Sequence, residues 1–426
     1  MKKLIVKGGQ QLHGEVTIGG AKNSTVALIP AAILADSKVR FDNVPDILDV
    51  HNLMLILESM NVSSHFNRGN LEIDPTQIRK APLPGDTIRS LRASYYFMGA
   101  LLGRFGEAIV GFPGGDNIGP RPIDQHIKGF KALGAEVEEK DNAVHIKAGA
   151  DGLHGAEIFF DLVSVGATIN VLLAAVKAKG TTIMENVARE PEIVDLATFL
   201  NNMGAHIRGA GTDVIRVEGV PSLKMTNTHS IIPDRIEAGT YLSFAAANGK
   251  GVLVRNLITE HLDPFIAKLK EMGVTLEINE DSIYVPGGDK LSPVTIKTAP
   301  YPGFATDLQQ PITPLLMRAQ GSSSIIDTLY PQRVKHIPEM QRMGANISSK
   351  DGIITVKRSP NLIGQTVEAG EIRAGVSILG LALMADGVTT INRADNILRG
   401  YERIIDKFKG LSVDLKIVNE TESLHK

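Results

Sequence analysis

Cysteine is absent from this chain of 426 residues. Its absence excludes disulfide bonds, zinc sites with thiolate ligands and catalytic cysteines. A strong excess of charge is also absent: 45 Lys and Arg stand against 47 Asp and Glu, which leaves a formal net charge of -2. No basic field therefore indicates nucleic acid as a partner. This composition is typical of a soluble cytoplasmic enzyme.

Long apolar runs are missing as well. Gly, Thr or Asn interrupts the apolar helical segments within about fifteen residues, short of the roughly twenty that a membrane-spanning helix needs. Residues 1–6 contain two lysines and only a short apolar stretch, which predicts a strand rather than a signal peptide. We therefore expect a cytoplasmic protein without membrane insertion.

One short pattern occurs six times along the chain. An amphipathic helix ends at Leu or Met, a Gly, Asn or Ser follows, and Ala or Val then begins a strand. The six copies start at Met60, Leu133, Met203, Met272, Met343 and Leu411, in steps of 73, 70, 69, 71 and 68 residues. Glycine after the last helical turn is the usual left-handed cap, and the alternating segment after it indicates a half-buried strand. The chain thus contains six supersecondary units of about 70 residues, which must associate to bury their apolar faces.

A second, more apolar helix occurs once in each unit. The expected ranges are 22–35, 92–102, 164–178, 235–248, 307–319 and 373–385. Small and apolar interior positions predict helices that are buried on all sides. If three units form each of two domains, six helix N-termini would face one cleft, with basic residues among them, and would form an anion site. The alternative interpretation is that these basic residues lie at the helix ends without binding a ligand.

The segment 111–126 is a candidate catalytic loop. It combines four glycines and three prolines in sixteen residues with an acid and a cation, Asp116 and Arg121. Such a segment between a strand and a helix is typical of a lid over a binding site. An ordinary surface loop is the alternative interpretation.

Six segments together resemble one enzyme family over essentially the whole chain. They are Gly19–Asn23, Pro113–Asp124, Ser164–Thr168, Ala188–Asp195, Thr298–Asp307 and Arg399–Arg403. The family is that of the UDP-N-acetylglucosamine 1-carboxyvinyltransferases, bacterial cytoplasmic enzymes. They transfer the enolpyruvyl group of phosphoenolpyruvate to the 3-hydroxyl of UDP-N-acetylglucosamine and release phosphate, in the first committed step of peptidoglycan synthesis. The resemblance thus implies a transferase in cell wall biogenesis, and hence in cell shape and division.

The resemblance also implies a fold. It is the α/β two-domain enolpyruvyl transferase fold, an inside-out α/β barrel of six repeated units. We expect residues 22–232 to form one domain, which carries the loop 111–126. Residues 1–21 and 233–426 would form the other, with the active site in the interdomain cleft.

Site residues follow from the resemblance position by position. The expected catalytic residues are Asp116, Lys22, Asp307 and Arg399. Those expected to bind phosphoenolpyruvate are Lys22, Asn23, Arg121 and Arg399. Those expected to bind UDP-N-acetylglucosamine are Arg92, Arg121, Pro122, Ile123, Asp124, Gln125, Val163, Ser164, Val165, Gly166, Asp307 and Leu329. Arg333, Glu371 and Arg373 would support them. No metal and no organic cofactor is implied, and the partners are the two small substrates.

The sequence departs from the family pattern at several places. Asp116 stands where most members have the cysteine that fosfomycin alkylates, so the resemblance implies a fosfomycin-resistant enzyme with Asp116 as proton donor. Leu162 replaces a lysine of some members, Glu371 replaces an aspartate, and Pro331-Gln332 replaces an acidic residue and Asn in many members. Two alternative functions remain open: a weak or silent paralogue that binds UDP-N-acetylglucosamine, and a 5-enolpyruvylshikimate-3-phosphate synthase. The oligomeric state is not predicted.

Overall fold

The computed structural model of the protein describes residues 1–83, 85–88, 92–112 and 121–419, without the side chains of residues 86, 87, 92 and 93. The chain divides into two compact units. Of the described residues, unit 1 contains 1–19 and 233–419, and unit 2 contains the rest.

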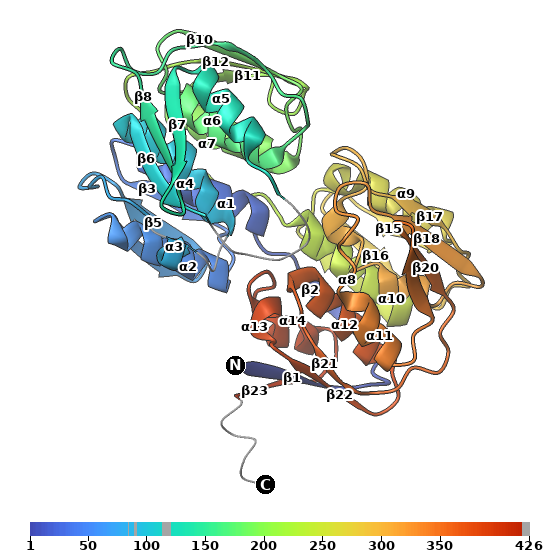
Figure 1. The fold of residues 1–426 in the computed structure, drawn as a ribbon. Coiled ribbons are helices and arrows are strands. Elements are labelled where there is room, and N and C mark those ends of the chain that lie inside the picture. Colours follow the sequence, from blue (N-terminus) through green and yellow to red (C-terminus); the bar gives the residue numbers. More distant parts are fainter. Residues whose placement is uncertain (84, 89–91, 113–120, 420–426) are drawn as a thin grey trace. The chain divides into compact units, whose positions relative to one another are not determined.

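Unit 2 combines three sheets with buried and surface helices (Figure 1). Its strands are β3 Val39–Asp42, β4 Ser63–Asn67, β5 Asn70–Asp74, β6 Glu107–Gly111, β7 Ala135–Lys140, β8 Ala143–Ala148, β9 Glu157–Phe159, β10 Thr181–Glu185, β11 His206–Arg208, β12 Val214–Glu218 and β13 His229–Ser230. Its helices are α1 Lys22–Ala31, α2 Leu48–Ser59, α3 Gly85–Ile88, α4 Tyr96–Phe105, α5 Asp124–Ala132, α6 Val165–Ala175, α7 Pro191–Asn202 and the 3-10 helices Ala32–Leu34 and Arg92–Tyr95.

Unit 1 also contains three sheets. Its strands are β1 Lys2–Lys7, β2 Leu12–Thr17, β14 Gly249–Arg255, β15 Glu277–Ile278, β16 Ser282–Val285, β17 Thr295–Lys297, β18 Ser322–Ile326, β19 Ile347–Lys350, β20 Ile353–Lys357, β21 Thr366–Glu368, β22 Val388–Asn392 and β23 Leu415–Asn419. Its helices are α8 Arg235–Asn248, α9 Asp263–Glu271, α10 Thr313–Leu316, α11 His336–Arg342, α12 Ile372–Met384, α13 Asp395–Leu398, α14 Ile404–Gly410 and the 3-10 helices Thr259–Leu262 and Thr306–Leu308.

All six sheets share one topology. A parallel pair is followed by two antiparallel pairs, as in the order β9-β10-β12-β11. In the sheet of β6, β8 and β7 the parallel pair is reduced to a single bridge between Leu83 and Val110. Strand β13 completes the sheet of β3, and strand β1 enters between β22 and β23. The described residues thus confirm the fold that the repeats and the resemblance predicted.

The left-handed helix cap that defines the sequence repeat is present in all six repeats. The residues after the amphipathic helices are left-handed, with φ between 61° and 102°: Asn61, Gly134, Gly204, Gly273, Gly344 and Ser412. Asparagine tolerates this conformation better than most residues other than glycine, which explains its use at one of these positions.

Five of the six apolar helices form close to the predicted ranges, and their side chains contribute a large share of the two cores. In α8, for example, every residue from Ile236 to Ala247 is buried. Helix α4 packs against both α1 and α6 in unit 2, and α10 packs against α8 and α12 in unit 1. Helices therefore fill the interior of each unit, while the sheets lie towards its surface (Figure 1).

The fifth apolar helix was predicted wrongly. Instead of one helix over 307–319, the chain forms the 3-10 helix Thr306–Leu308, a turn, and the four-residue helix α10. Pro311 and Pro314 lie inside the predicted range. Each proline lacks a backbone N–H and clashes with the carbonyl four residues earlier, so a continuous helix is broken here.

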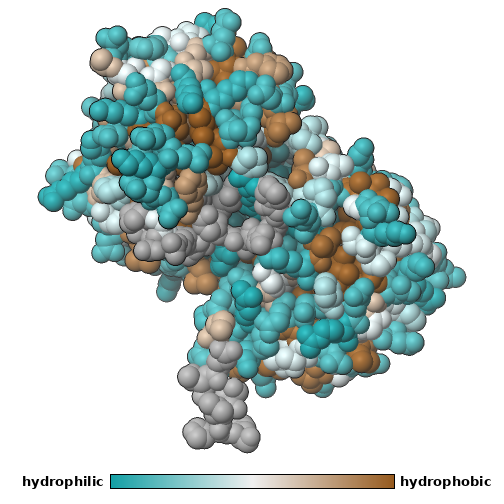
Figure 2. Space-filling model, viewed as in Figure 1, coloured by the Kyte–Doolittle hydropathy of each residue, from teal (hydrophilic) through white to brown (hydrophobic). Residues whose placement is uncertain are grey.

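No helix among the described residues is long and apolar enough to cross a membrane. Hydrophilic residues cover most of the face shown in Figure 2, and apolar residues form small groups on it.

Candidate active site

The densest group of charged candidate residues lies in unit 1, around Asp307. Arg333 Nη1 donates to Asp307 Oδ1 at 2.8 Å, and Arg373 Nη2 lies 3.5 Å from Oδ2 of the same carboxylate. Both arginine side chains are 3% exposed, whereas the Asp307 side chain is 26% exposed. Two buried guanidinium groups therefore fix the plane of a carboxylate that still reaches the surface of the unit.

Glu371 holds Arg333 from the other side. Its two carboxylate oxygens lie 3.4 and 3.3 Å from Arg333 Nε and Nη2, and it is 1% exposed. Burial alone would lower the pKa of Arg333, but Asp307 and Glu371 outweigh it and raise the pKa above its usual value. Arg333 is therefore a permanent cation between two carboxylates.

Arg373 has an aromatic partner in addition to Asp307. Its guanidinium lies 5.2 Å from the ring centroid of Tyr401, and the Tyr401 hydroxyl is 2.9 Å from Thr240 Oγ1. Burial would lower the pKa of Arg373, but Tyr401 and Asp307 raise it. Burial also raises the pKa of Tyr401. This packing orients the Arg373 side chain towards Asp307.

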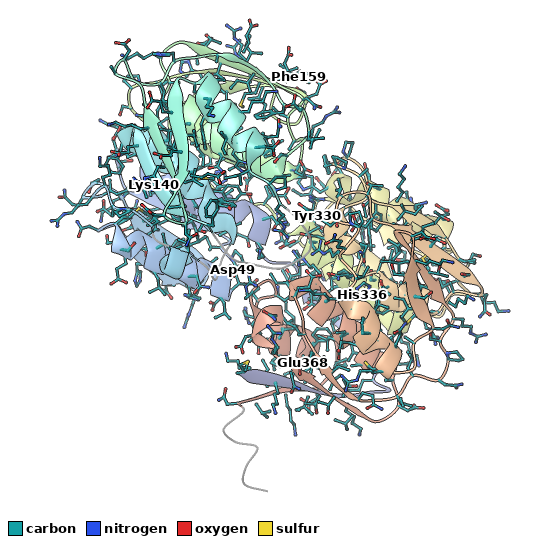
Figure 3. The ribbon with its side chains drawn as sticks, in the orientation of Figure 1. Asp49, Lys140, Phe159, Tyr330, His336 and Glu368 are labelled. Carbon is teal, nitrogen blue, oxygen red and sulfur yellow. The ribbon has the colours of Figure 1, made fainter. Side chains whose placement is uncertain are left out.

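Lys22, in unit 2, also has an acidic partner. It is the first residue of α1, and its Nζ lies 3.3 Å from Asp49 Oδ2 in the first turn of α2. Asp49 is fully buried, while the Lys22 side chain is 13% exposed (Asp49 is labelled in Figure 3). A cation opposes the dipole at a helix N-terminus, and a buried carboxylate offsets this cost. Asn23 follows Lys22 in the same turn and is half-buried.

The N-terminus of α6 carries the expected Ser-Val-Gly segment. Ser164 is the N-cap, and its Oγ accepts the amide of Ala167 at 3.2 Å. The amides of the first helical turn, which includes Val165 and Gly166, have no acceptor within the helix and point along the axis. A Cβ on Gly166 would lie 2.9 Å from His126 Nε2, so any larger residue here would displace the His126 side chain of α5. These features suit an anion.

An apolar lip precedes this helix. Leu162 and Val163 are 65% and 39% exposed, and Phe159 at the end of β9 is 57% exposed (Figure 3). Asp161 lies between them and binds Lys128 Nζ at 2.8 Å and Gln125 Nε2 at 3.1 Å. Gln125, which is expected to bind the sugar nucleotide, is thereby tied to the segment between β9 and α6.

The remaining expected residues fall into three cases. Arg121, which is half-buried, and Pro122 lead into α5, Ile123 is its N-cap, and Asp124 begins it. Arg399 is half-buried after α13, and Leu329 is 37% exposed after β18. Residues 113–120 of the loop 111–126, which include Asp116, and the side chain of Arg92 lie outside the described part of the chain.

Sequence reasoning did not find Asp49 and Tyr401, nor Asp327, a buried carboxylate that accepts from Thr306 Oγ1 beside Asp307 at 2.7 Å. Asp327 follows strand β18 directly, and a carboxylate after a buried strand could have drawn attention to it. Asp49 lies on an ordinary amphipathic helix, and nothing in its local pattern separates it from a surface residue. Among the described residues, no group of three or more His, Asp or Glu side chains is arranged to hold a metal ion.

Comparisons with known proteins show which family the chain resembles. The sequence pattern of the family described as EPSP synthase (3-phosphoshikimate 1-carboxyvinyltransferase) matches residues 6–408. The chain is 66% identical over 422 residues to UDP-N-acetylglucosamine 1-carboxyvinyltransferase 2 of Lactiplantibacillus plantarum, covering 99% of both chains. It is 63% identical over 420 residues to the protein of that name from Latilactobacillus sakei, covering 99% of this chain and 100% of the relative.

Solved structures give the same fold. The crystal structure of the enolpyruvyl transferase NikO from Streptomyces tendae superimposes with a TM-score of 0.88 at 24% identity, covering 98% of this chain and 99% of NikO. At that identity the similarity concerns the fold alone.

Proposed function

Because this chain belongs to the UDP-N-acetylglucosamine 1-carboxyvinyltransferase family, we propose that it transfers the enolpyruvyl group of phosphoenolpyruvate to the 3-hydroxyl of UDP-N-acetylglucosamine, with release of phosphate. The observation that carries the proposal is the 66% identity to a relative of that name over nearly the full length of both chains. In a bacterium this reaction is the first committed step of peptidoglycan synthesis, which belongs in the cytoplasm and serves cell wall growth and division.

The addition step of the reaction needs two proton transfers. The sugar hydroxyl loses a proton as its oxygen attacks C-2 of phosphoenolpyruvate, and the methylene carbon gains one. The tetrahedral adduct then loses phosphate and a methyl proton, which restores the double bond in the product. The enzyme must therefore supply a base near the hydroxyl and an acid near the methylene.

We assign the base to Asp307. Its carboxylate is the exposed member of a buried cluster, and Arg333 and Arg373 fix its orientation. Glu371, the other carboxylate of the cluster, is 1% exposed and is bound to Arg333 through both oxygens. A base must reach the proton that it takes, so the exposed carboxylate is the better candidate.

In this proposal the two substrates bind to different groups of the protein. Lys22, with Asn23, Arg121 and Arg399, binds the phosphate and carboxylate of phosphoenolpyruvate. The diphosphate of the sugar nucleotide binds at the N-terminus of α6, where helical amides and the dipole favour an anion. Arg92, the segment 121–125 and Leu329 complete the sugar nucleotide site. Leu162, in the exposed apolar lip, has no charge that could bind the diphosphate. The helix amides therefore contribute more to diphosphate binding than in family members with lysine at this position.

Asp116 is the proposed acid. A carboxylic acid can deliver the proton only if its pKa rises well above the unperturbed value of about 3.9, through loss of water and nearby bound anions. The chain has no cysteine. The proposed enzyme is therefore resistant to fosfomycin, which acts by alkylating a thiol.

The test is phosphate release on mixing both substrates, with mass spectrometry of the nucleotide product. We expect phosphate and an enolpyruvyl sugar nucleotide in equal amounts. In a parallel reaction shikimate 3-phosphate replaces UDP-N-acetylglucosamine as the acceptor. Turnover with shikimate 3-phosphate alone would indicate a 5-enolpyruvylshikimate-3-phosphate synthase. Tight binding of UDP-N-acetylglucosamine without any phosphate release would instead indicate a silent paralogue.

A further inference from the structure

One buried carboxylate contacts the turn that carries the proposed base. Asp327 follows strand β18 and is 4% exposed. Five donors surround it, and the described residues give it no salt bridge: the donors are two threonine hydroxyls, one glutamine amide and two backbone amides. Neutral donors arranged in this way stabilise a buried carboxylate only while their geometry is kept.

The five bonds divide between the two oxygens. Oδ2 accepts from Thr306 Oγ1 at 2.7 Å and lies 3.4 Å from Gln309 Nε2. Thr306 begins the 3-10 helix that carries Asp307, and Gln309 is the C-cap that follows it. Oδ2 thus holds both ends of the turn that presents the proposed base.

Oδ1 binds a different segment. It accepts from the amides of Leu329 and Tyr330 at 3.1 and 2.9 Å and from Thr298 Oγ1 at 2.8 Å (Tyr330 is labelled in Figure 3). Thr298 Oγ1 in turn accepts the amide of Thr328 at 3.0 Å. This half of the network fixes the turn 328–330, which carries the proposed sugar contact Leu329.

The network also reaches the cation of the proposed base. Arg333 Nη1 lies 3.3 Å from Thr306 Oγ1, and Gln309 Nε2 donates to the Arg333 carbonyl at 3.1 Å. Thr306 therefore accepts from Arg333 and donates to Asp327. A change at Asp327 Oδ2 is transmitted to Asp307 through both the turn and Arg333.

We propose that Asp327 is a positioning residue whose two oxygens set two substrate-facing segments separately. Oδ2 orients the turn of Asp307 and so acts on turnover, whereas Oδ1 orients the turn of Leu329 and so acts on sugar binding. This inference rests on the proposed function, and in particular on Asp307 as the base.

Asp327→Asn separates the two halves, because the amide oxygen can keep the donors of Oδ1 while its NH2 group replaces Oδ2. We expect kcat to fall about ten- to hundredfold, the range that a displacement of about 1 Å produces. The KM for UDP-N-acetylglucosamine should change less than about threefold. Thr306→Val should give the same result, and the double variant should be no slower than the slower single one, since both remove one bond.

Thr298→Val tests the other oxygen. It should raise the KM for UDP-N-acetylglucosamine about three- to tenfold and leave kcat within about threefold. Thr306→Ser keeps the hydroxyl and should retain turnover within about threefold. Asp289→Asn is the matched control, since Asp289 also accepts an amide and a hydroxyl, both from Thr275, but outside this network. It should change neither parameter.

The inference is overturned if Thr306→Val and Thr298→Val give the same change, or if the effects of Asp327→Asn and Thr306→Val multiply. It is also overturned if Thr306→Ser is as slow as Thr306→Val. These comparisons do not depend on Asp327→Asn folding. An inactive wild-type chain would overturn the proposed function together with this inference. An active wild type with a fully active Asp307→Asn would overturn the inference and leave the proposed function standing.

Discussion

Arg333 donates to Asp307 from a position that solvent barely reaches. The Nη1–Oδ1 distance is 2.8 Å, and the arginine side chain is 3% exposed. A hydrogen bond between charged groups is stronger where water is excluded. Asp307 is therefore held in one orientation before any substrate arrives, which favours a preorganised base over a structural ion pair on the surface.

Asp307→Asn tests this role. The amide keeps the size of the carboxylate and one acceptor oxygen, but it cannot take the hydroxyl proton. We expect turnover to fall roughly a hundredfold or more, while calorimetric binding of UDP-N-acetylglucosamine persists. Turnover near the wild-type rate would assign the base elsewhere, with Glu371 as the next residue to test.

Lys22 and Arg92 should affect different substrates. We expect Lys22→Ala to weaken phosphoenolpyruvate binding more than sugar nucleotide binding, and Lys22→Arg to be milder because it keeps the charge beside Asp49. Arg92→Ala should show the opposite preference. The measurement is the affinity for each substrate alone, and equal losses for both substrates in both variants would show that the sites are misassigned.

The buried ion pairs of unit 1 make a prediction about stability. Arg333→Met removes the cation and leaves Glu371 buried without it, which should lower the free energy of unfolding by about 3–5 kcal/mol. Adding Glu371→Met should recover part of the loss, since no charge is then left unpaired. Arg342→Met is the control: Arg342 is 53% exposed beside Glu339, and its loss should cost less than about 1 kcal/mol. Urea denaturation measures all three, and a single Arg333→Met variant as stable as the control would contradict the prediction.

His336 should make stability depend on pH. It is fully buried on α11, where Gln310 Nε2 lies 3.1 Å from its Nδ1, and burial together with Arg333 lowers its pKa to about 3 (Figure 3). Between about pH 6.5 and 3 the unfolded chain binds a proton at this histidine and the folded chain does not, so this contribution to stability falls as pH falls. It should amount to about 2 kcal/mol between pH 7.5 and 5.

His336→Asn should remove that part of the pH dependence, although the variant is less stable at every pH. His206→Asn is the control, because His206 is 64% exposed and should leave the slope unchanged. Thermal unfolding at several pH values measures the slopes. Equal slopes for wild type and His336→Asn would show that His336 takes up its proton over the same pH range in the folded and unfolded chains, which contradicts the prediction.

Fosfomycin tests Asp116. A protonated carboxylic acid is a poor nucleophile, so we expect turnover to continue in the inhibitor and mass spectrometry to find no adduct. Asp116→Cys should restore time-dependent inactivation and extend the pH-rate profile to higher pH, because an unperturbed thiol keeps its proton up to about pH 8.5. An adduct on the unmodified chain would mean that Asp116 is ionised and nucleophilic, and the acid would have to be another group.

The repeats could be predicted from sequence because their signals are local. The caps at Gly134 or Gly344 depend only on the turn that they end, so one sequence pattern suffices. Pro311 and Pro314 are equally local signals, and they indicate a break in the helix predicted over 307–319. The prediction was wrong because it followed the apolar pattern around them instead. Pairs such as Lys22 with Asp49, or Asp327 with Thr298, depend instead on how separate elements pack, and no spacing along the chain encodes that.

The insertion of strand β1 between β22 and β23 has a consequence for synthesis on the ribosome. The strands of unit 2 all lie between residues 20 and 232, so each of them can pair once residue 232 has left the ribosome. Strand β1 is made first, yet Leu4 pairs with Ile391 and Ile417. At about 5–20 residues per second, β1 waits on the order of twenty to eighty seconds for those partners. Strand β1 is therefore synthesised before its partner strands but is among the last strands to pair. Unit 2 has time to fold while unit 1 is still being translated.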